Sequence, residues 1–194
     1  MNQVFNKQVK LAFMIVLCLF LVAGVYFFLF FDKSEYRKDS KGLSVNYSSS
    51  NIVTIKNTLP ISDSLGKGFD GKGTEEGVQA YLEFTVKNVR NYTIPYDIIL
   101  TKQHNYDELI SDNYVKFYLT DAEDNPLPGF EKNVLPSFYD LYYLTDKPAS
   151  KELYQDTLAA GEEKTYHLRM WLSDQYAISF DPEYYSVDVG VHIR

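Results

Sequence analysis

Cysteine and tryptophan are scarce in this sequence of 194 residues, which contains one of each, Cys18 and Trp171. A single cysteine excludes an intrachain disulfide and any zinc site built on clustered thiolates. The chain also lacks an excess of positive charge. It contains 19 Lys and Arg residues and 26 Asp and Glu residues, which gives a formal net charge of -7. Since nucleic-acid recognition favours a basic face, we expect no nucleic-acid partner.

Tyrosine and phenylalanine, by contrast, are abundant, with 17 and 13 copies, and this composition favours strands over helices and over disorder. Apolar and polar residues alternate in segment after segment, which is typical of antiparallel sheets with one buried face. We predict an all-β fold, an antiparallel immunoglobulin-like β-sandwich over residues 51–194. Its predicted strands are 51–55, 77–88, 91–100, 113–121, 165–172 and 185–194, with turns at 89–91, 123–126 and 159–162.

The N-terminal part contains an uncharged apolar run of 21 residues, 11–31. A helix needs about 20 such residues to span a bilayer, and a buried core helix would show a polar stripe. The apolar part of a cleaved signal peptide is shorter, about 7–15 residues, and ends at a small-residue site. We therefore predict an uncleaved transmembrane signal anchor at 11–31, after a cytoplasmic tail at 1–10. Residues 32–50 are predicted to be a polar juxtamembrane tether whose end forms a first strand.

The positive-inside rule alone would place the C-terminal side of this run in the cytoplasm, since two lysines precede the run and four basic residues follow it within residues 32–41. Long domains, however, translocate largely regardless of flanking charge. We therefore predict a single-pass protein of the cell membrane whose C-terminal domain is extracytoplasmic.

Residues 66–74, GKGFDGKGT, have the G-x-x-x-x-G-K spacing of a phosphate-binding loop, with Gly73 in place of Ser or Thr. Such a loop needs a strand before it and a helix after it. Pro60 breaks any central strand before the loop, and an alternating strand follows it. We expect no nucleotide and no cofactor, and interpret residues 60–77 as a glycine-rich connection between strands.

An acidic turn between two predicted strands contains Asp121, Glu123 and Asp124. Carboxylates on a turn are calcium ligands, but the spacing of a calcium-binding loop is absent, so we favour a polar hairpin turn and keep calcium as the weaker alternative. The three histidines form no closely spaced pair, and no serine lies in a G-x-S-x-G motif. The sequence therefore predicts no transition-metal site and no catalytic residues, and we expect that the protein is not an enzyme.

Four aromatic residues, Tyr139, Tyr142, Tyr143 and Trp171, form a candidate partner surface. Tyrosine and tryptophan are favoured at binding surfaces because they bring a large contact area with few rotatable bonds. Packing within the sheets is the alternative, and exposure to solvent decides between the two.

Three segments carry a resemblance to a known group: NTLPISDSLGKGFDGKGTEEGVQAYLEFTVKN, YVKFYLTDAEDNPLPGFE and YHLRMWLSDQY, within residues 57–176. The chain resembles uncharacterised single-pass membrane proteins of low-GC Gram-positive bacteria with a β-sandwich ectodomain. Its EFTVKN segment is also similar to camelysin and TasA-like surface proteins, although those have a cleavable signal. The resemblance implies a surface location and carries no catalytic residue over.

These observations predict a non-enzymatic, membrane-anchored, extracytoplasmic interaction or structural protein of the cell envelope. Its expected partners are the lipid bilayer and a protein, either a different one or further copies of itself. Two alternatives stay open: an accessory subunit of a membrane complex that acts through its transmembrane helix, and a ligand-binding or hydrolytic ectodomain.

Overall fold

Two antiparallel sheets face each other in this computed structural model, which describes residues 37–38, 42–56, 58–68, 80–103, 110–147, 149–177 and 184–194. These residues belong to one unit, Arg37–Arg194, and Met1–Tyr36 forms another. The predicted cytoplasmic tail and the apolar run 11–31 lie outside the described residues. Within the described ranges, no helix is both long enough and apolar enough to cross a membrane.

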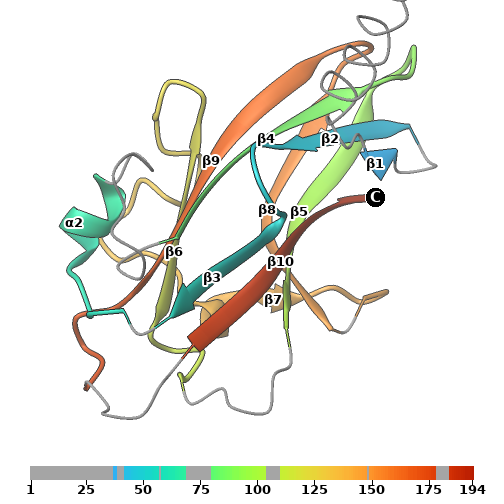
Figure 1. The fold of residues 1–194 in the computed structure, drawn as a ribbon. Helices are drawn as coiled ribbons and strands as arrows, with labels where there is room; N and C mark the ends of the chain where they lie inside the picture. Colours follow the sequence, from blue (N-terminus) through green and yellow to red (C-terminus); the bar gives the residue numbers. More distant parts are fainter. Residues whose placement is uncertain are drawn as a thin grey trace, which may run out of the picture. The chain divides into compact units, whose positions relative to one another are not determined.

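Each sheet contains five strands (Figure 1). The first sheet has the order β1 (Arg37–Lys38), β2 (Leu43–Tyr47), β4 (Ala80–Asn88), β9 (Glu163–Leu172) and β6 (Val115–Asp121). The second sheet has the order β3 (Ile52–Lys56), β10 (Tyr184–Ile193), β5 (Ile94–Lys102), β8 (Ser150–Leu158) and β7 (Tyr142–Tyr143). Two short helices accompany them, α2 (Asp63–Lys67) and the 3₁₀ helix η1 (Phe138–Asp140). The all-β, antiparallel part of the prediction is confirmed.

The apolar core lies between the sheets and follows the predicted alternation. Leu82, Phe84 and Val86 on β4 are buried, and so are Leu168 and Met170 on β9. Residues from both sheets join in one apolar cluster, as expected when each sheet has to cover its hydrophobic face against the other.

Successive strands from β2 to β6 alternate between the two sheets, and so do β8, β9 and β10. The connections that follow β4 and β8 therefore cross from one sheet to the other. Both of these turns lie at the same end of the sandwich, where Asn88 joins them by hydrogen bonds to the carbonyls of Leu158 and Ala159.

β2 forms at the end of the predicted tether, where a first strand was expected. Its Leu43 and Val45 alternate with polar residues and pair with β4. The first sheet therefore begins before residue 51. Three strands were not predicted, namely the two-residue strands β1 and β7 and the longer β8. In β8, a bulge places Leu153 as an extra residue opposite Ile98 and Ile99 and so breaks the alternation.

The glycine-rich connection also differs from expectation, since α2 forms within it and packs on the outer face of β9. Gly66 is buried there, and a Cβ atom added to it would lie 2.3 Å from the indole ring of Trp171. The first glycine of the phosphate-loop pattern thus has a packing role, because only a residue without a side chain lets the helix approach this ring. Residues 69–79 lie outside the described ranges.

Candidate functional site

The tyrosine segment predicted as a partner surface lies at the outer edge of the second sheet, where β7 is the last strand of the sheet order. Tyr139, Tyr142 and Tyr143 are 67%, 82% and 64% exposed, whereas Phe138 is buried in the core. We call the three exposed residues the tyrosine ridge. Figure 1 shows β7 at the lower end of the sandwich, far from β1.

Local hydrogen bonds fix the backbone under the ridge. The amide and the hydroxyl of Ser137 both donate to Oδ2 of Asp140, at 2.8 and 2.7 Å, and close a capping box around η1. These bonds hold the pKa of the Asp140 carboxyl below its usual value. The amide of Tyr139 donates to the carbonyl of Asp112 at 3.2 Å. The ridge therefore stands on a structured turn.

Lys151 lies directly behind the ridge, buried at the start of β8. Its Nζ donates to the carbonyls of Phe138 and Tyr139, at 2.7 and 3.2 Å. The same atom lies 4.6 Å from the ring centre of Tyr143 and 4.8 Å from that of Phe138, within the range of cation–π attraction. Burial lowers the pKa of Lys151. One buried cation thus binds η1 and β7 to β8.

Trp171, predicted on the same partner surface, is fully buried, contrary to that prediction. Its side chain does point away from the core, on the same face of β9 as His167 and Arg169. However, α2 covers this part of the face, and Gly66 packs against the indole ring. Of the four aromatic residues predicted as a partner surface, the three tyrosines of the ridge are exposed and Trp171 is not.

The acidic turn is organised by protein hydrogen bonds. Oδ1 of Asp121 accepts from the amides of Glu123 and Asn125, at 3.0 and 2.8 Å, and its Oδ2 accepts from the Asn125 side chain at 3.1 Å. Asp124 has a φ of 62° and turns its carboxylate back onto the first sheet. Across the described ranges, no three His, Cys, Asp or Glu side chains are grouped so as to hold a metal ion. The geometry matches the hairpin-turn interpretation.

A buried arginine, Arg169, receives the Asp124 carboxylate on the outer face of the first sheet. Its Nη2 lies 2.7 Å from Oδ1 of Asp124, and its Nη1 donates to Oγ1 of Thr120 at 3.1 Å. The guanidinium carbon lies 5.5 Å from the ring centre of Tyr81 and 5.8 Å from that of Tyr118. Sequence reasoning missed this cluster because it depends on register: Tyr81, Arg169 and Tyr118 are cross-strand partners on β4, β9 and β6.

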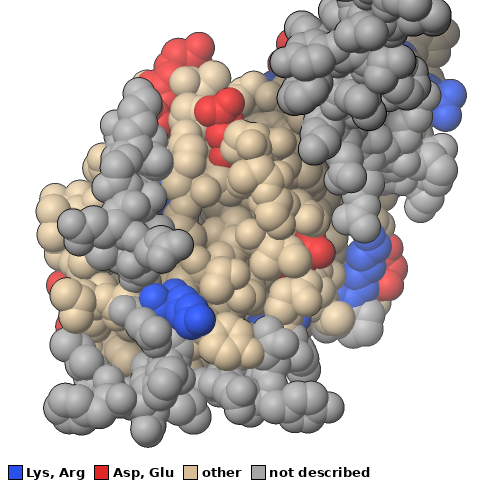
Figure 2. All heavy atoms as spheres, viewed as in Figure 1, with Lys and Arg blue, Asp and Glu red and all other residues tan. Residues whose placement is uncertain are grey.

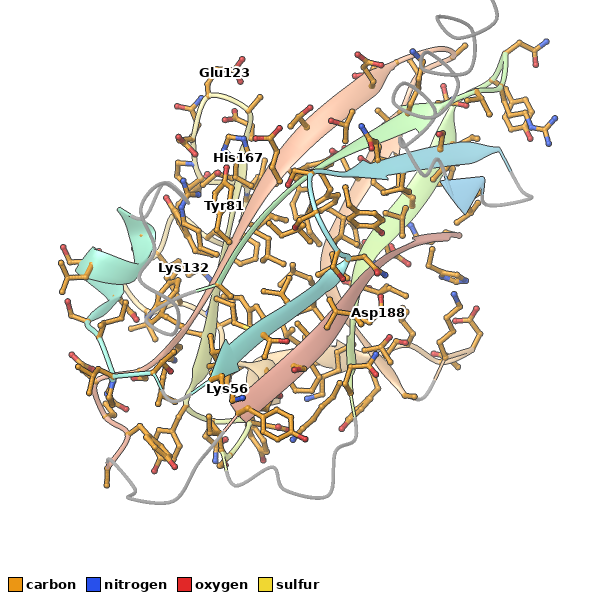
Figure 3. All side chains as sticks on the ribbon, viewed as in Figure 1. Lys56, Tyr81, Glu123, Lys132, His167 and Asp188 are labelled. Carbon is orange, nitrogen blue, oxygen red and sulfur yellow. The ribbon has the colours of Figure 1, made fainter. Side chains whose placement is uncertain are left out.

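His167 completes this cluster beside the aromatic face of Tyr81 (Figure 3). Its Nδ1 lies 2.7 Å from Oδ1 of Asp124, and its Nε2 lies 3.6 Å from Oε2 of Glu83. Hydrogen bonds from Arg169 and then from His167 lower the pKa of Asp124 to about 2. We call Asp124, His167 and Arg169 the loop clamp, because together they hold the turn after β6 on the sheet.

His192 makes a comparable connection on the second sheet. Its Nε2 lies 3.0 Å from Oδ2 of Asp146, in the connection after β7, and its Nδ1 lies 3.9 Å from Oδ2 of Asp97 on β5. Asp97 is buried, which raises the pKa of its carboxyl, and it pairs with Arg194 at 3.1 Å. Like His167, His192 connects a strand carboxylate with a loop carboxylate. The remaining histidine, His104, lies outside the described residues.

Charge on the described surface is scattered. Figure 2 shows one face on which Lys and Arg side chains occur at a few separate places, and Asp and Glu occur mainly toward the upper left and the right. Among the described residues visible in that view, no basic stripe of the kind used for nucleic acid is formed.

Comparisons with known proteins give little further guidance. No protein-family model matches this chain, and no curated protein is similar to it in sequence. A solved structure of AvmM, which catalyzes macrocyclization in alchivemycin A biosynthesis, shares 9% sequence identity with a TM-score of 0.33, covering 71% of this chain and 72% of that one. A likeness this distant supports no conclusion about the activity of this chain.

Proposed function

We propose that this chain is a non-enzymatic, membrane-anchored interaction protein of the cell envelope, with its sandwich outside the cytoplasm. The anchor is supported by the uncharged run 11–31, which has the length needed to span a bilayer. The interaction is supported by the tyrosine ridge, which fits a protein partner.

The observation that carries this proposal is the exposure of three tyrosine rings on a fixed sheet edge. Tyrosines contribute much of the energy of protein interfaces because they bury a large area and lose few rotamers. Lys151 and the capping box preorder the ridge, so that less conformational entropy is lost on binding. As the outermost strand of its sheet, β7 also offers its edge to an extended segment of a partner protein. These features together favour a protein as the ligand.

A binding role is favoured over catalysis by what the candidate polar side chains already do. His167 and Arg169 are both engaged with Asp124 in the loop clamp, and His192 lies between two carboxylates. A general base would need a free path to a substrate proton. We therefore assign these residues to holding loops on the sheets.

For the finer class of the sandwich, we propose an immunoglobulin-like layering without the immunoglobulin strand order. Immunoglobulin domains place strands ABED in one sheet and CFG in the other. In this chain, successive strands from β2 to β6 alternate between the sheets.

Site-specific photo-crosslinking tests the proposed interaction. Position 142 of the full chain receives a benzoyl-phenylalanine in place of Tyr142, and the chain is illuminated in native membranes. We expect a discrete adduct of defined mass that is lost when Tyr139→Ser and Tyr143→Ser are added. The matched control carries the same photo-reactive residue in place of Tyr92, another exposed tyrosine, which lies on the β4–β5 turn.

The possible outcomes distinguish the kinds of partner. An adduct of twice the chain mass identifies self-assembly, and a heavier or lighter discrete adduct identifies a different partner. An adduct that survives both serine substitutions, or that forms equally from position 92, would show that the ridge does not direct the contact.

A further inference from the structure

A second exposed apolar surface lies at the other end of the sandwich, on the turns that follow β4 and β8. Val89 and Tyr92 on the first of these turns are 53% and 57% exposed. Ala159 and Ala160 on the second turn are also exposed. We call residues 88–93 and 158–162 the Asn88 turns. Figure 1 shows both at the upper right, the same end of the sandwich as β1.

Asn88 is fully buried and joins the two turns. Its side-chain Nδ2 donates to the carbonyls of Tyr92, Leu158 and Ala159, at 2.7, 3.1 and 2.9 Å. Its Oδ1 accepts from the amide of Arg90 at 2.8 Å. The exposed side chains are therefore presented on a backbone that is fixed in place.

The chain enters the sandwich at this same end. The carbonyl of Gly42 accepts from the amide of Val89 at 3.0 Å. Gly42 has a φ of 118°, and a Cβ atom there would lie 2.6 Å from the Arg90 side chain, so glycine allows the close contact. Just before it in the chain, Lys38 on β1 pairs with Ser44 on β2. The first described residues thus lie beside the Asn88 turns.

The apolar run ends at residue 31, and five residues, 32–36, separate it from β1. A fully extended chain spans at most about 3.6 Å per residue, so this connection reaches about 20 Å. The headgroup region of one leaflet is itself several ångströms thick. With residues 11–31 in the bilayer, as proposed above, a connection this short keeps the entry end of the sandwich within reach of the membrane surface.

We propose that the Asn88 turns dock on the headgroup region of the bilayer. This inference rests on the proposed membrane anchor and adds which surface meets the lipid. Tyr92 has the amphipathic ring that favours the membrane interface, and Val89 supplies an apolar contact beside it. Arg90 carries a positive charge that anionic headgroups attract.

Docking by the Asn88 turns also determines which way the tyrosine ridge faces relative to the bilayer. β8 connects the two ends, with Lys151 behind the ridge and Leu158 at the Asn88 turns. Nine strand residues at about 3.3 Å each extend over roughly 25–30 Å. Docking by the Asn88 turns therefore places the ridge away from the bilayer, where a partner protein can reach it.

Spin labelling of the full chain tests the docking. In a Cys18→Ser background, a single cysteine replaces Val89 or Tyr92, and Tyr142→Cys is the matched control at the opposite end. The labelled chains are reconstituted in vesicles of phosphatidylcholine and phosphatidylglycerol, and collision rates with oxygen and with a water-soluble nickel complex are compared. Far-UV circular dichroism and the fluorescence of Trp171 confirm that each variant keeps its fold.

We expect labels at 89 and 92 to collide more with oxygen and less with nickel than the label at 142. Labels at 89 and 92 that are as accessible to nickel as the label at 142, in chains that float with the vesicles, would overturn the docking and leave the anchor intact. Labels shielded from both reagents would also overturn it, since they would indicate contact with protein. Chains that do not float with the vesicles would refute the anchor itself.

Discussion

The two ends of the sandwich are built on the same plan with different chemistry. At each end, one buried polar side chain extends beyond its own strand and binds main-chain carbonyls of neighbouring turns. Asn88 donates to three carbonyls at the entry end. Lys151 donates to two carbonyls and faces aromatic rings at the ridge end.

The difference between an amide and an ammonium determines how each end responds to substitution. The amide of Asn88 both donates and accepts, so it also fixes the Arg90 amide, and its burial removes no charge from water. The ammonium of Lys151 only donates, and its desolvation cost offsets part of what its bonds contribute. We therefore expect the entry end to depend more strongly on its central residue.

The largest expected effect is that of Asn88→Ala. Each neutral hydrogen bond contributes about 0.5–1.5 kcal/mol, and carbonyls left unpaired add to the loss, so we expect a decrease of about 2–4 kcal/mol in the free energy of unfolding. Urea unfolding of the full chain in detergent, followed by far-UV circular dichroism and Trp171 fluorescence, measures it. Asn133→Ala, at an exposed loop position, is the control and should change stability little. Equal losses in both variants would contradict the role of Asn88.

A smaller effect is expected for Lys151→Met, which keeps the length of the side chain and removes its charge. Two carbonyls lose their donor, but a buried ammonium is also removed, so we expect a loss of about 1–2 kcal/mol. The ridge should loosen, and crosslinking from position 142 should weaken, while spin labels at 92 keep their membrane depth. Lys147→Met, at a nearby exposed position, is the control. If labels at 92 shift as well, the two ends are not independent.

Much of this fold was predictable from the sequence because alternation reports directly on a half-buried strand. The segments that form β4, β6 and β9 were predicted as strands with one buried face, and the three turns lie where they were expected. β8 was missed because its bulge at Leu153 breaks the alternation and because Lys151 points toward the core. Neither feature can be read from a periodic pattern.

The candidate surfaces were harder to predict, because exposure depends on what covers a strand face. Trp171 was predicted on a partner surface, because the sequence pattern does not reveal the helix that packs over its ring. The loop clamp depends on the register of three neighbouring strands. The role of Asn88 depends on contact between two turns that are far apart in the sequence, since Asn88 and Leu158 are 70 residues apart. Such contacts are set by the tertiary arrangement, so single-sequence patterns carry little signal for them.

The smallest expected effect concerns the loop clamp, which lies on the flank of the first sheet. Asp124 has a pKa of about 2 in the folded chain and about 3.9 when unfolded, so its ionised form stabilises the fold above about pH 4. This contribution is lost as the pH falls from about 4 through 2. Because the Asp124 side chain is 55% exposed, solvent screening keeps the contribution modest.

Asp124→Asn isolates this contribution, since asparagine also tolerates a positive φ. We expect the variant to unfold at lower urea than the parent at neutral pH, and the difference to shrink as the pH falls below about 4, because the parent then loses the same charge. Other carboxylates, including Asp140, are common to both chains and cancel in the comparison. A difference that stays constant down to about pH 2 would show that the Asp124 charge does not hold the loop. Both ends of the sandwich should be unaffected, because the clamp shares no hydrogen bond with Asn88 or Lys151 among the described contacts.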